Sequence, residues 1–433
     1  MYPAPFPASL TTEPLVRGAG AGAVYAITLL KTLGFDARRG PGPFDHPAEC
    51  WARSGAMALT GFSGGPPLMC PAPLASCASG VKLALEALLP EAFVDLDGAA
   101  MLGARAAFTG YRRNGAIAPG GGCRLLPTRD GIIAINLVRE DDWIMLPAWL
   151  EEDVAADWDA LGQHLATRRL EHLVERARLL GLAVAAVTPP SSRPWFRVGE
   201  EVRVPPPKAP PRVVDLSSLW AGPLAARLLR RAGAHVVKVE SETRPDGARL
   251  GNRAFFDFVN AGKEEVRLDF RTQCDELVRL IESADIVIEA SRPRALLQLG
   301  IDANALVRKR PGLLWLSITG HGRDAPEGEW IAFGDDAGIA AGLGHIMKEA
   351  HGQPLFCADA VADPLTGLHA ALAALAFYRQ GRGGLVALSL SDVVAHCAMF
   401  DPPREGWRVR AKAWGARLAE RGIVASPPRV PSC

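Results

Sequence analysis

The sequence predicts an α/β protein in which a doubly wound, parallel, Rossmann-like sheet follows residue 212 and a smaller α+β domain precedes it. Three observations predict this architecture. Strand-like and helix-like segments alternate from residue 213 to residue 320, a proline-rich stretch interrupts the chain at residues 199–212, and a segment of the first half recurs in the second half. Alternating strands and helices are typical of parallel sheets that are covered by helices.

Apolar, β-branched runs in the second half predict its strands, at residues 213–217, 235–240, 264–270, 285–291 and 313–320. Amphipathic segments between them predict the covering helices. Ligands of such sheets bind where the parallel strands end. The first of these ends, from Ser217 to Pro223, has no GxGxxG pattern, so we do not expect a nicotinamide dinucleotide. The others run from Glu240 to Arg244, from Ser291 to Arg294 and from Thr319 to Arg323.

The first half begins with residues 14–38, which predict a strand, a turn and a helix, with a second strand near Phe35. Gly18, Gly20 and Ala23 fit a loose GxGxxA turn, but no acid follows that would hold a ribose. We therefore interpret this segment as a helix packed through glycines.

Residues 51–90 predict two helices, and Ile132 to Val138 predict a strand of a small α+β segment. Residues 141–150 and a helix near 160–180 complete that segment. Gly120, Gly121 and Gly122 lie just before it in a turn-rich stretch. This triplet fits a plain flexible loop, or a loop that covers a reactive group and offers backbone N–H donors.

The composition bounds the class of protein. Hydrophobic residues make up 48% and charged residues 22% of the 433 residues, which is typical of a globular protein of more than one domain. With a net charge of +1, no global field recruits nucleic acid or a membrane. The eight cysteines include no CxxC pair and no zinc spacing, so we expect reduced thiols, a cytoplasmic protein and no metal site. We expect neither a signal peptide in MYPAPFPASL nor a membrane span.

An internal repeat aligns residues 67–88 with residues 354–375 without a gap. Pro67, Cys70, Gly80 and Leu88 coincide with Pro354, Cys357, Gly367 and Leu375. Ser76 of the first copy occupies the position of Asp363 in the second. The chain therefore resembles two related units, each incomplete in a different way.

Asp363 precedes Pro364 at the start of a long apolar helix. One interpretation is an N-cap, a common position for aspartate. The other is a nucleophilic carboxylate that the helix start helps to keep ionised. The local sequence fits both.

The second half resembles a known family. VVDLSSLWAGPLAARLLRRAGAHVVKVES resembles the opening strand–helix–strand of the class III CoA-transferases, the CaiB/BaiF family. NAGKEEVRLDF, ADIVIEASRP and LLWLSITGHGRDAP resemble its next blocks in the same order. AVADPLTGLHAALAALAFYRQGRGG resembles its active-site block, in which an aspartate is the covalent nucleophile, and Asp363 falls on that position. Gly120 to Gly122 resemble the family's glycine loop, which closes over the aspartate.

The resemblance implies an acyl-CoA:carboxylate CoA-transferase with a fold of the class III type. Its substrates would be an acyl-CoA donor and a carboxylic acid acceptor, with a CoA thioester as substrate and no permanently bound cofactor. Ala221 is an expected CoA contact. Arg292 and Arg294, just past a strand end, are either contacts for the CoA phosphates or surface arginines beside a loop proline. The family implies a homodimer that can be interlocked. We divide the chain into an abridged first unit (1–198), a proline-rich linker (199–212), a CoA-binding unit (213–400) and a basic tail (401–433).

Some features depart from the family pattern. The glycine-loop half precedes the nucleotide-fold half, and Trp220 stands where some members carry a glutamine. Gly334-Asp335-Asp336 lacks the histidine of the related acyl-CoA racemases. Two alternatives therefore remain: racemase-type α-proton chemistry, with Asp363 paired with Asp335 or Asp336, and a non-catalytic CoA-binding subunit.

Overall fold

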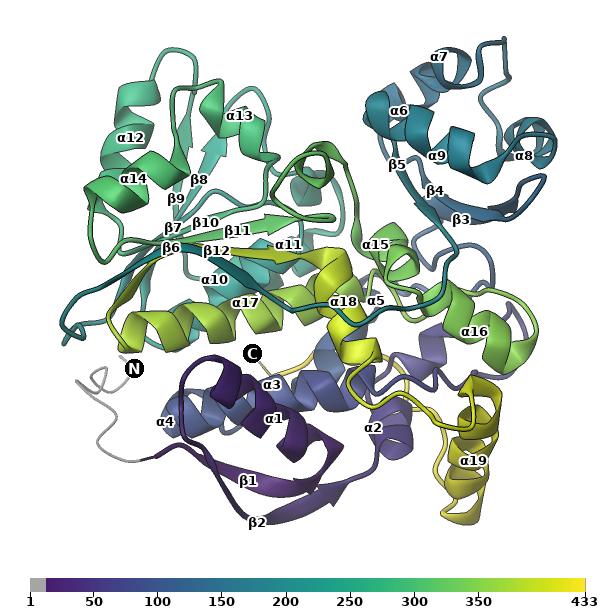
Figure 1. The fold of residues 1–433 in the computed structure, drawn as a ribbon, viewed down its shortest axis with the longest axis horizontal. Helices are drawn as coiled ribbons and strands as arrows, with labels where there is room; N and C mark the ends of the chain where they lie inside the picture. The colour runs from purple at the N-terminus through teal and green to yellow at the C-terminus, as the bar shows by residue number, and fades with distance from the viewer. Residues whose placement is uncertain (1–12, 433) are drawn as a thin grey trace.

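The computed structural model describes residues 13–432. Figure 1 shows a large sheet with helices on both faces, a smaller domain set apart from it, and a layer of helices with a two-stranded sheet beneath. The prediction about a signal peptide concerns residues 1–10, which lie outside the described residues.

The large sheet has seven strands in the order β6-β12-β11-β10-β7-β8-β9, and only the β6–β12 pair is antiparallel. The direction of strand addition reverses between β7 and β10, as in doubly wound sheets. The predicted mixed α/β fold with a large, mostly parallel sheet is thereby confirmed. Its strands are β6 (Arg197–Arg203), β7 (Arg212–Asp215), β8 (His235–Ser241), β9 (Glu264–Leu268), β10 (Ile286–Glu289), β11 (Leu314–Thr319) and β12 (Arg382–Ser389).

Residues 199–203 correct the sequence analysis, which assigned them to the linker. They form the end of β6, which pairs with β12 at the edge of the sheet. The prolines that follow, from Pro205 onward, cannot donate to a strand ladder and end the pairing there.

Successive residues of the central strands enter two different cores, because side chains alternate across a strand. Val213 and Ile286 pack on the α10 and α17 side, whereas Val214 and Val287 pack on the α12 and α14 side. Figure 1 shows these helix pairs on opposite faces of the sheet. The helices of this region are α10 (Ala221–Arg231), α11 (Arg253–Asn260), α12 (Cys274–Ser283), α13 (Pro293–Leu297), α14 (Ala303–Lys309) and α17 (Ala362–Arg379), with the 3₁₀ turns η3 (Gly247–Leu250) and η4 (Glu327–Glu329).

Helix α17 lies at the centre of the molecule. It contacts α10, the sheet and α3 of the first half, and every one of its residues except Asp363 is buried. A helix that is apolar all round is stable only inside a core. The single position that reaches solvent is therefore the acidic one.

The first half begins with a parallel β1–α1–β2 unit, whose helix packs on α3. The second strand of this unit begins at Arg38, not near Phe35 as predicted. Phe35 instead closes the end of α1, through its N–H bond to Leu30 O (2.9 Å), and packs on the core. The elements are β1 (Leu15–Gly20), α1 (Ala21–Thr32), β2 (Arg38–Asp45), α2 (Pro47–Arg53), η1 (Met57–Leu59), α3 (Leu74–Leu88), α4 (Pro90–Phe93), η2 (Ala100–Gly103) and α5 (Ala104–Thr109).

The smaller domain is an antiparallel sheet of order β3-β4-β5 with its own apolar core. Two helices occupy the region where one was predicted near 160–180. The elements are β3 (Cys123–Pro127), β4 (Ile132–Asn136), α6 (Glu140–Ile144), α7 (Leu146–Leu150), α8 (Trp158–Ala166), α9 (Leu170–Leu179) and β5 (Ala183–Ala186).

The remaining helices connect the small domain, the sheet and the C-terminal tail. They are α15 (Gly334–Ala340), α16 (Leu343–His351), α18 (Leu390–Ala398) and α19 (Trp407–Glu420). Helix α19 lies on α2 and α16 with Trp414 and Leu418 buried, and Arg417 pairs with Glu49 at 3.0 Å. Between residues 13 and 432, no helix combines the length and the apolar character that crossing a membrane requires.

The close contact between α10 and α17 yields a stability prediction. A Cβ atom on Gly367 would lie 2.7 Å from Ala221 O and 3.0 Å from Leu224 Cβ. We therefore expect Gly367→Ala to force the two helices apart and to lower the free energy of unfolding by about 1–3 kcal/mol. The control is Gly415→Ala in α19, where a Cβ atom would meet nothing within 4 Å. There alanine should raise stability by up to about 1 kcal/mol. Thermal melting measures both, and equal effects of the two changes would contradict the prediction.

Candidate active site

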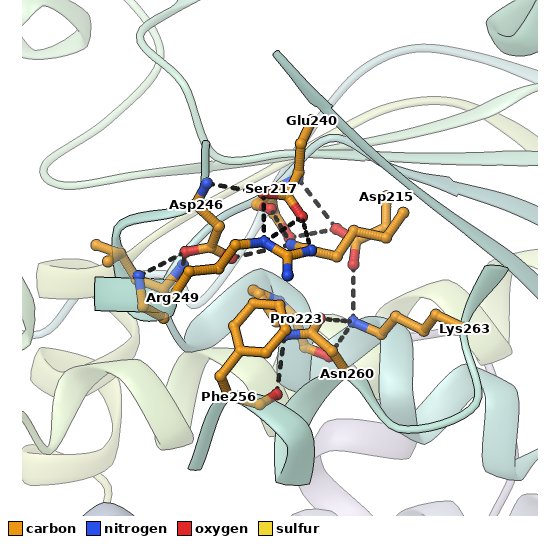
Figure 2. Close-up of polar contacts among 12 residues, drawn as sticks. Asp215, Ser217, Pro223, Glu240, Asp246, Arg249, Phe256, Asn260 and Lys263 are labelled. Carbon is orange, nitrogen blue, oxygen red and sulfur yellow. Dashed lines mark hydrogen bonds and ion pairs between the residues drawn. The ribbon is translucent and has the colours of Figure 1, made fainter. Parts of the chain in front are cut away.

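The turn between β7 and α10 rests on a buried ion-pair network (Figure 2). Lys263 Nζ donates to Asp215 Oδ2 (2.8 Å), to Asn260 Oδ1 (2.9 Å) and to the carbonyl oxygen of Pro223 (2.9 Å). The other carboxylate oxygen of Asp215 accepts the N–H and the hydroxyl of Ser217. One ammonium group and one carboxylate thus fix both ends of the turn.

A second pair extends this network under β8. Lys238 Nζ donates to Asp246 Oδ2 (2.9 Å) and to Ser217 O (3.0 Å), and Arg249 pairs with Glu240 (2.6 Å). Burial alone would lower the pKa of Lys238, but Asp215 and Asp246 raise it above its usual value. Burial lowers the pKa of Lys263 to about 8, and Asp215 opposes that shift. Lys238 therefore has a structural role beneath the turn between β7 and α10.

Asp363 lies in the first turn of α17, but it is not the N-cap. The cap residue is Val361, which offers no side-chain acceptor, so the capping interpretation is wrong. The backbone N–H of Ala221, at the start of α10, instead faces the Asp363 carboxylate and lowers its pKa. Its Oδ2 atom would lie 2.1 Å from a Cβ atom on Gly334, so only glycine fits at the start of α15. The first turns of α10, α15 and α17 thus meet at one carboxyl group, where their N–H dipoles favour negative charge.

Backbone strain is concentrated around this carboxyl group. Ala358 (φ 60°) and Ala360 (φ 44°) adopt left-handed conformations just before α17, and Leu219 (φ 69°) does so just before α10. Such conformations cost on the order of 1 kcal/mol for residues with a Cβ atom, and they cluster at functional sites. The Ala358 N–H donates to Thr60 Oγ1 (2.9 Å) and the Ala360 N–H to Asp335 Oδ1 (2.8 Å), which holds the strained segment.

Arg105, on α5 of the first half, makes a bidentate pair with Asp359. Its Nε and Nη2 atoms lie 2.8 and 2.5 Å from the two carboxylate oxygens. The guanidinium group also lies 5.6 Å from the centre of the Tyr111 ring and 5.5 Å from that of Trp220. Burial would lower the pKa of Arg105, but Asp359 raises it above its ordinary range. Asp335 and Asp363 also interact electrostatically with Arg105. We call Asp335, Asp359 and Asp363 the acid cluster.

The acids have unusual protonation behaviour. Burial raises the pKa of Asp363 to about 7, with Asp335 adding to the shift while Arg105 and the Ala221 N–H oppose it. Burial and the charge of Asp359 raise the pKa of Asp335 to about 6, against the opposing field of Arg105. The sequence analysis expected the helix start to help keep Asp363 ionised, but burial outweighs that effect. Asp335 and Asp363 therefore influence each other's titration.

Asp336 faces the small domain. Its Oδ1 atom accepts from Asn136 Nδ2 (2.9 Å) and from the Phe333 N–H (3.0 Å). Burial raises the pKa of Asp336 to about 7, and Asn136 opposes the shift. Asp336 therefore couples β4 to α15, whereas Asp335 belongs to the Asp363 cluster.

The glycine loop lies beside Arg105. A Cβ atom on Gly120 would lie 3.4 Å from the Tyr111 ring and 3.7 Å from Arg105 Nη2, and Gly121 has φ 80°. Within residues 13–432, the backbone N–H groups of Gly120 and Gly122 have no acceptor. Gly120 lies beside Arg105, the cation of the acid cluster, which fits the interpretation of the loop as a cover.

Arg292 and Arg294 flank the start of α13, after β10. Arg294 pairs with Glu329 at 3.0 Å, whereas Arg292 makes no ion pair with any described residue. Burial and the neighbouring Arg294 lower the pKa of Arg292. Arg292 also approaches the small domain, with Nη1 4.0 Å from a Cβ atom built on Gly181.

Ser76, which corresponds to Asp363 in the internal repeat, has different neighbours. Ser76 Oγ donates to Asp45 Oδ2 (3.0 Å), and the Gly22 N–H at the start of α1 lies 3.2 Å from both carboxylate oxygens. A carboxylate from the end of β2 thus occupies the helix start in the first half. In the second half, the acid of α17 itself occupies the corresponding place beside α10.

Sequence reasoning missed Arg105, and it missed Asp359 except as a neighbour of Asp363. Arg105 lies in a short helix of ordinary composition, far along the chain from Asp363, so no local signal marks it. Asp359 had a signal that could be noticed, because it directly precedes the block that contains Asp363.

About half of the chain matches a known family. A model of the family described as "CoA-transferase family III" matches residues 211–425. Over 208 residues, the chain is 32% identical to a succinate–glutarate CoA-transferase of Agrobacterium fabrum, covering 43% of this chain and 52% of that protein. Over 196 residues, it is 29% identical to a formyl-CoA:oxalate CoA-transferase of Escherichia coli, covering 42% and 47%. A solved CaiB/BaiF family protein from Brucella suis is 32% identical, with a TM-score of 0.38 over 42% of this chain and 53% of that one.

Residues 211–425 therefore carry the sequence pattern of CoA-transferase family III. The chain spans about half the length of the curated relatives it matches, and those relatives are named as CoA-transferases. The family match includes Asp363, Ala221, Arg292 and Arg294, whereas Arg105 and the glycine loop lie before it.

The raised pKa of Asp363 yields a prediction about stability. An acid whose folded pKa is about 7 and whose unfolded pKa is about 4 binds its proton more tightly when folded. Its contribution to stability is full below pH 4 and is lost as the pH rises through 7. We therefore expect the melting temperature of Asp363→Asn, relative to that of the wild type, to rise as the pH increases from 4 to 8, because Asn does not titrate. The control is Asp153→Asn, an exposed acid outside the site. If the difference in melting temperature between the wild type and Asp363→Asn stays constant with pH, the folded pKa of Asp363 is ordinary.

Proposed function

We propose that this protein is an acyl-CoA:carboxylate CoA-transferase in which Asp363 is the covalent nucleophile. The observation that carries the proposal is the setting of Asp363. It is the one residue of helix α17 that is only half-buried, the Ala221 N–H lowers its pKa, and it lies within the field of Arg105. The named relatives add support, since they act by name on succinate and glutarate, or on formyl-CoA and oxalate.

The chemistry would proceed by two linked acyl exchanges. The Asp363 carboxylate attacks the thioester carbonyl of the donor, and the CoA thiolate leaves, which gives a mixed anhydride. The thiolate then attacks the aspartyl carbonyl, which forms an aspartyl-CoA thioester and releases the donor acid. The acceptor carboxylate attacks that thioester and expels the thiolate. The thiolate finally attacks the acceptor carbonyl of the new anhydride, which yields the product acyl-CoA and restores the Asp363 carboxylate.

Several groups of this site suit those steps. Each tetrahedral intermediate carries an oxyanion, which needs N–H donors, and the Gly120 and Gly122 N–H groups lack an acceptor in the described part of the chain. Burial destabilises the ionised Asp363 carboxylate and so makes it a better nucleophile. Arg105 lowers the cost of forming that anion. Ala221, Arg292 and Arg294 are the proposed contacts for CoA, near the strand ends where doubly wound sheets bind ligands.

We also propose an abridged internal duplication, in which residues 1–198 and 213–400 are related units. Both contain a parallel strand–helix–strand unit, β1–α1–β2 and β7–α10–β8. Both pack that helix closely on a second one: a Cβ atom on Gly80 would lie 2.6 Å from Gly22 O, and one on Gly367 would lie 2.7 Å from Ala221 O. The first unit contributes Arg105 and the glycine loop, and the second contributes Asp363. The proposed site therefore draws both of its parts from one chain, and its chemistry does not depend on the homodimer that the resemblance implies.

One observation favours a second candidate function, racemase-type α-proton chemistry. Asp335 and Asp363 have raised pKa values of about 6 and 7, which suits a pair of acid–base groups. Incubation of a 2-methylacyl-CoA in D₂O without any acid acceptor separates the two proposals. Deuterium at the α-carbon would favour this chemistry, and transfer that requires an acceptor would exclude it as the main activity.

The nucleophile assignment yields the first test of the transferase proposal. Succinyl-CoA with glutarate and formyl-CoA with oxalate are the first pairs to assay, with the products read by mass spectrometry. We expect Asp363→Asn to lower transfer at least about 10³-fold, because an amide cannot form the anhydride, while melting stays cooperative. Hydroxylamine trapping after donor addition should leave a hydroxamate at residue 363. Binding of CoA without transfer from any donor in a broader panel would instead support a non-catalytic CoA-binding subunit. Transfer without an adduct at residue 363 would contradict the covalent route.

The glycine loop yields a second test. Gly121 has φ 80° and open space around it, so Gly121→Ala introduces backbone strain without a steric clash. We expect the variant still to form the aspartyl adduct but to close less completely over it, so that water competes with the acceptor. The measurement is the ratio of acyl-CoA hydrolysis to transfer, which should rise. Gly415→Ala in α19 is the control, and an unchanged ratio in Gly121→Ala would remove the loop from the mechanism.

A further inference from the structure

A cavity lies at the edge of the large sheet where the parallel strands end, away from the acid cluster. Its volume is about 530 Å³, and it opens where β11 and β12 end and β6 begins. None of Asp363, Asp335, Asp359, Arg105 or the glycine loop lines it. It reaches only the far end of α15, at Ala340 and Ala341, whereas the near end of that helix touches Asp363. The transferase chemistry proposed above does not use this cavity.

Two parts of the molecule form its walls. Arg178 comes from α9 of the small domain, and His321 and Trp330 come from the segment that follows β11. The Arg178 guanidinium carbon lies 3.7 Å from the centre of the Trp330 ring. The His321 ring meets the same indole edge-on, with centroids 5.8 Å apart. The indole covers one face of the guanidinium group and leaves its N–H edge for a ligand.

The charges in this cavity are unevenly paired. Two of its arginines are neutralised, Arg197 by Asp392 at 3.6 Å and Arg323 by Glu289. Within residues 13–432, Arg178 and Arg193 form no ion pair. Glu327 also lines the cavity, and its charge raises the pKa of Arg178, but burial has the larger effect and lowers that pKa. Asp324 lines the cavity too, but within residues 13–432 neither Arg178 nor Arg193 lies within ion-pair distance of an acid.

Two buried nitrogen atoms there also lack partners. Arg178 Nε and His321 Nε2 are shielded from solvent and have no hydrogen-bond partner in the described chain. A buried polar atom without a partner is destabilising, because it has lost its hydrogen bonds to water. Burial and the charge of Arg178 lower the pKa of His321 to about 4, so its imidazole is neutral at pH 7 and can donate from Nε2. Both atoms are supplied with a partner if a ligand oxygen enters the cavity.

We propose that this cavity is a second ligand site, which binds the carboxylate or phosphate group of a small anion through Arg178, Arg193 and His321 Nε2. Guanidinium groups pair with such oxyanions through two parallel N–H bonds. Arg193 comes from the segment that connects β5 of the small domain to β6 of the large sheet. The bound anion would join that segment and α9 to the end of β11. It would thereby fix the small domain, whose first strand directly follows the glycine loop.

The test uses the full-length chain carrying Asp363→Asn, so that its outcome does not depend on transfer activity. Isothermal titration with inorganic phosphate and, separately, with succinate is carried out at constant ionic strength. We expect at least one of the two to bind with a millimolar or tighter dissociation constant. Arg178→Gln should weaken that binding at least about tenfold, since it removes the paired N–H edge. Phosphate binding alone, or succinate binding alone, identifies which oxyanion source the cavity accepts.

Arg193→Gln provides an independent variant, because Arg193 is exposed and its loss does not threaten the fold. It should also weaken binding. The matched control is Arg169→Gln, an exposed arginine at the start of α9 and outside the cavity, which should leave the dissociation constant unchanged. Hydrogen exchange should show protection of residues 176–180 and 321–330 by the ligand. The proposal is overturned if neither anion binds, or if binding is the same in Arg178→Gln, Arg193→Gln and Arg169→Gln.

Discussion

The bidentate pair between Arg105 and Asp359 is the interaction on which the site depends. It joins a short helix of the first half to the strained segment that precedes α17. Without the guanidinium group, Asp335, Asp359 and Asp363 would be three acids in one desolvated space. Each ionised carboxylate would then raise the pKa of the other two. Removing one partner of a buried pair typically costs about 3–5 kcal/mol, because the other charge is left without compensation. The same contact therefore links the two halves, and the Arg105 charge opposes the rise in the pKa values of Asp335 and Asp363.

Opposing electrostatic effects then determine the state of Asp363. Burial and the neighbouring acids raise its pKa, whereas Arg105 and the Ala221 N–H lower it. The result is a carboxyl group that is only partly ionised at neutral pH, in contrast to an exposed aspartate. Such a balance suits a nucleophile that has to gain and lose a covalent bond, since an anion that is too well stabilised would attack slowly. The close approach at Gly334 shows how tightly the surrounding backbone confines this group.

The position of the Ala221 N–H depends in turn on the ion pairs beneath the β7–α10 turn. Lys263 bridges Asp215 to the carbonyl oxygen of Pro223, and Lys238 bridges Asp246 to Ser217. Buried ion pairs contribute little net stability, but they restrict the backbone to one arrangement when every hydrogen bond is satisfied. In the first half, the corresponding helix start faces the Asp45 carboxylate instead. The proposed duplication would thus have kept the packing of both helix pairs while only one of them presents an acid of its own.

The sequence by itself determined the strands and helices of the large sheet, because buried parallel strands and amphipathic helices leave periodic patterns that do not depend on distant residues. It also placed Asp363 on a motif, since the block around it is local and continuous. It placed β2 too early and assigned the end of β6 to a linker, because edge strands carry weak apolar patterns. Only the tertiary structure decided that Asp363 is not a cap, that Arg105 from the first half reaches Asp359, and that burial raises the pKa of Asp363. Those facts depend on which segments meet in space, and a contact between residues 105 and 359 leaves no periodic or local trace in the chain.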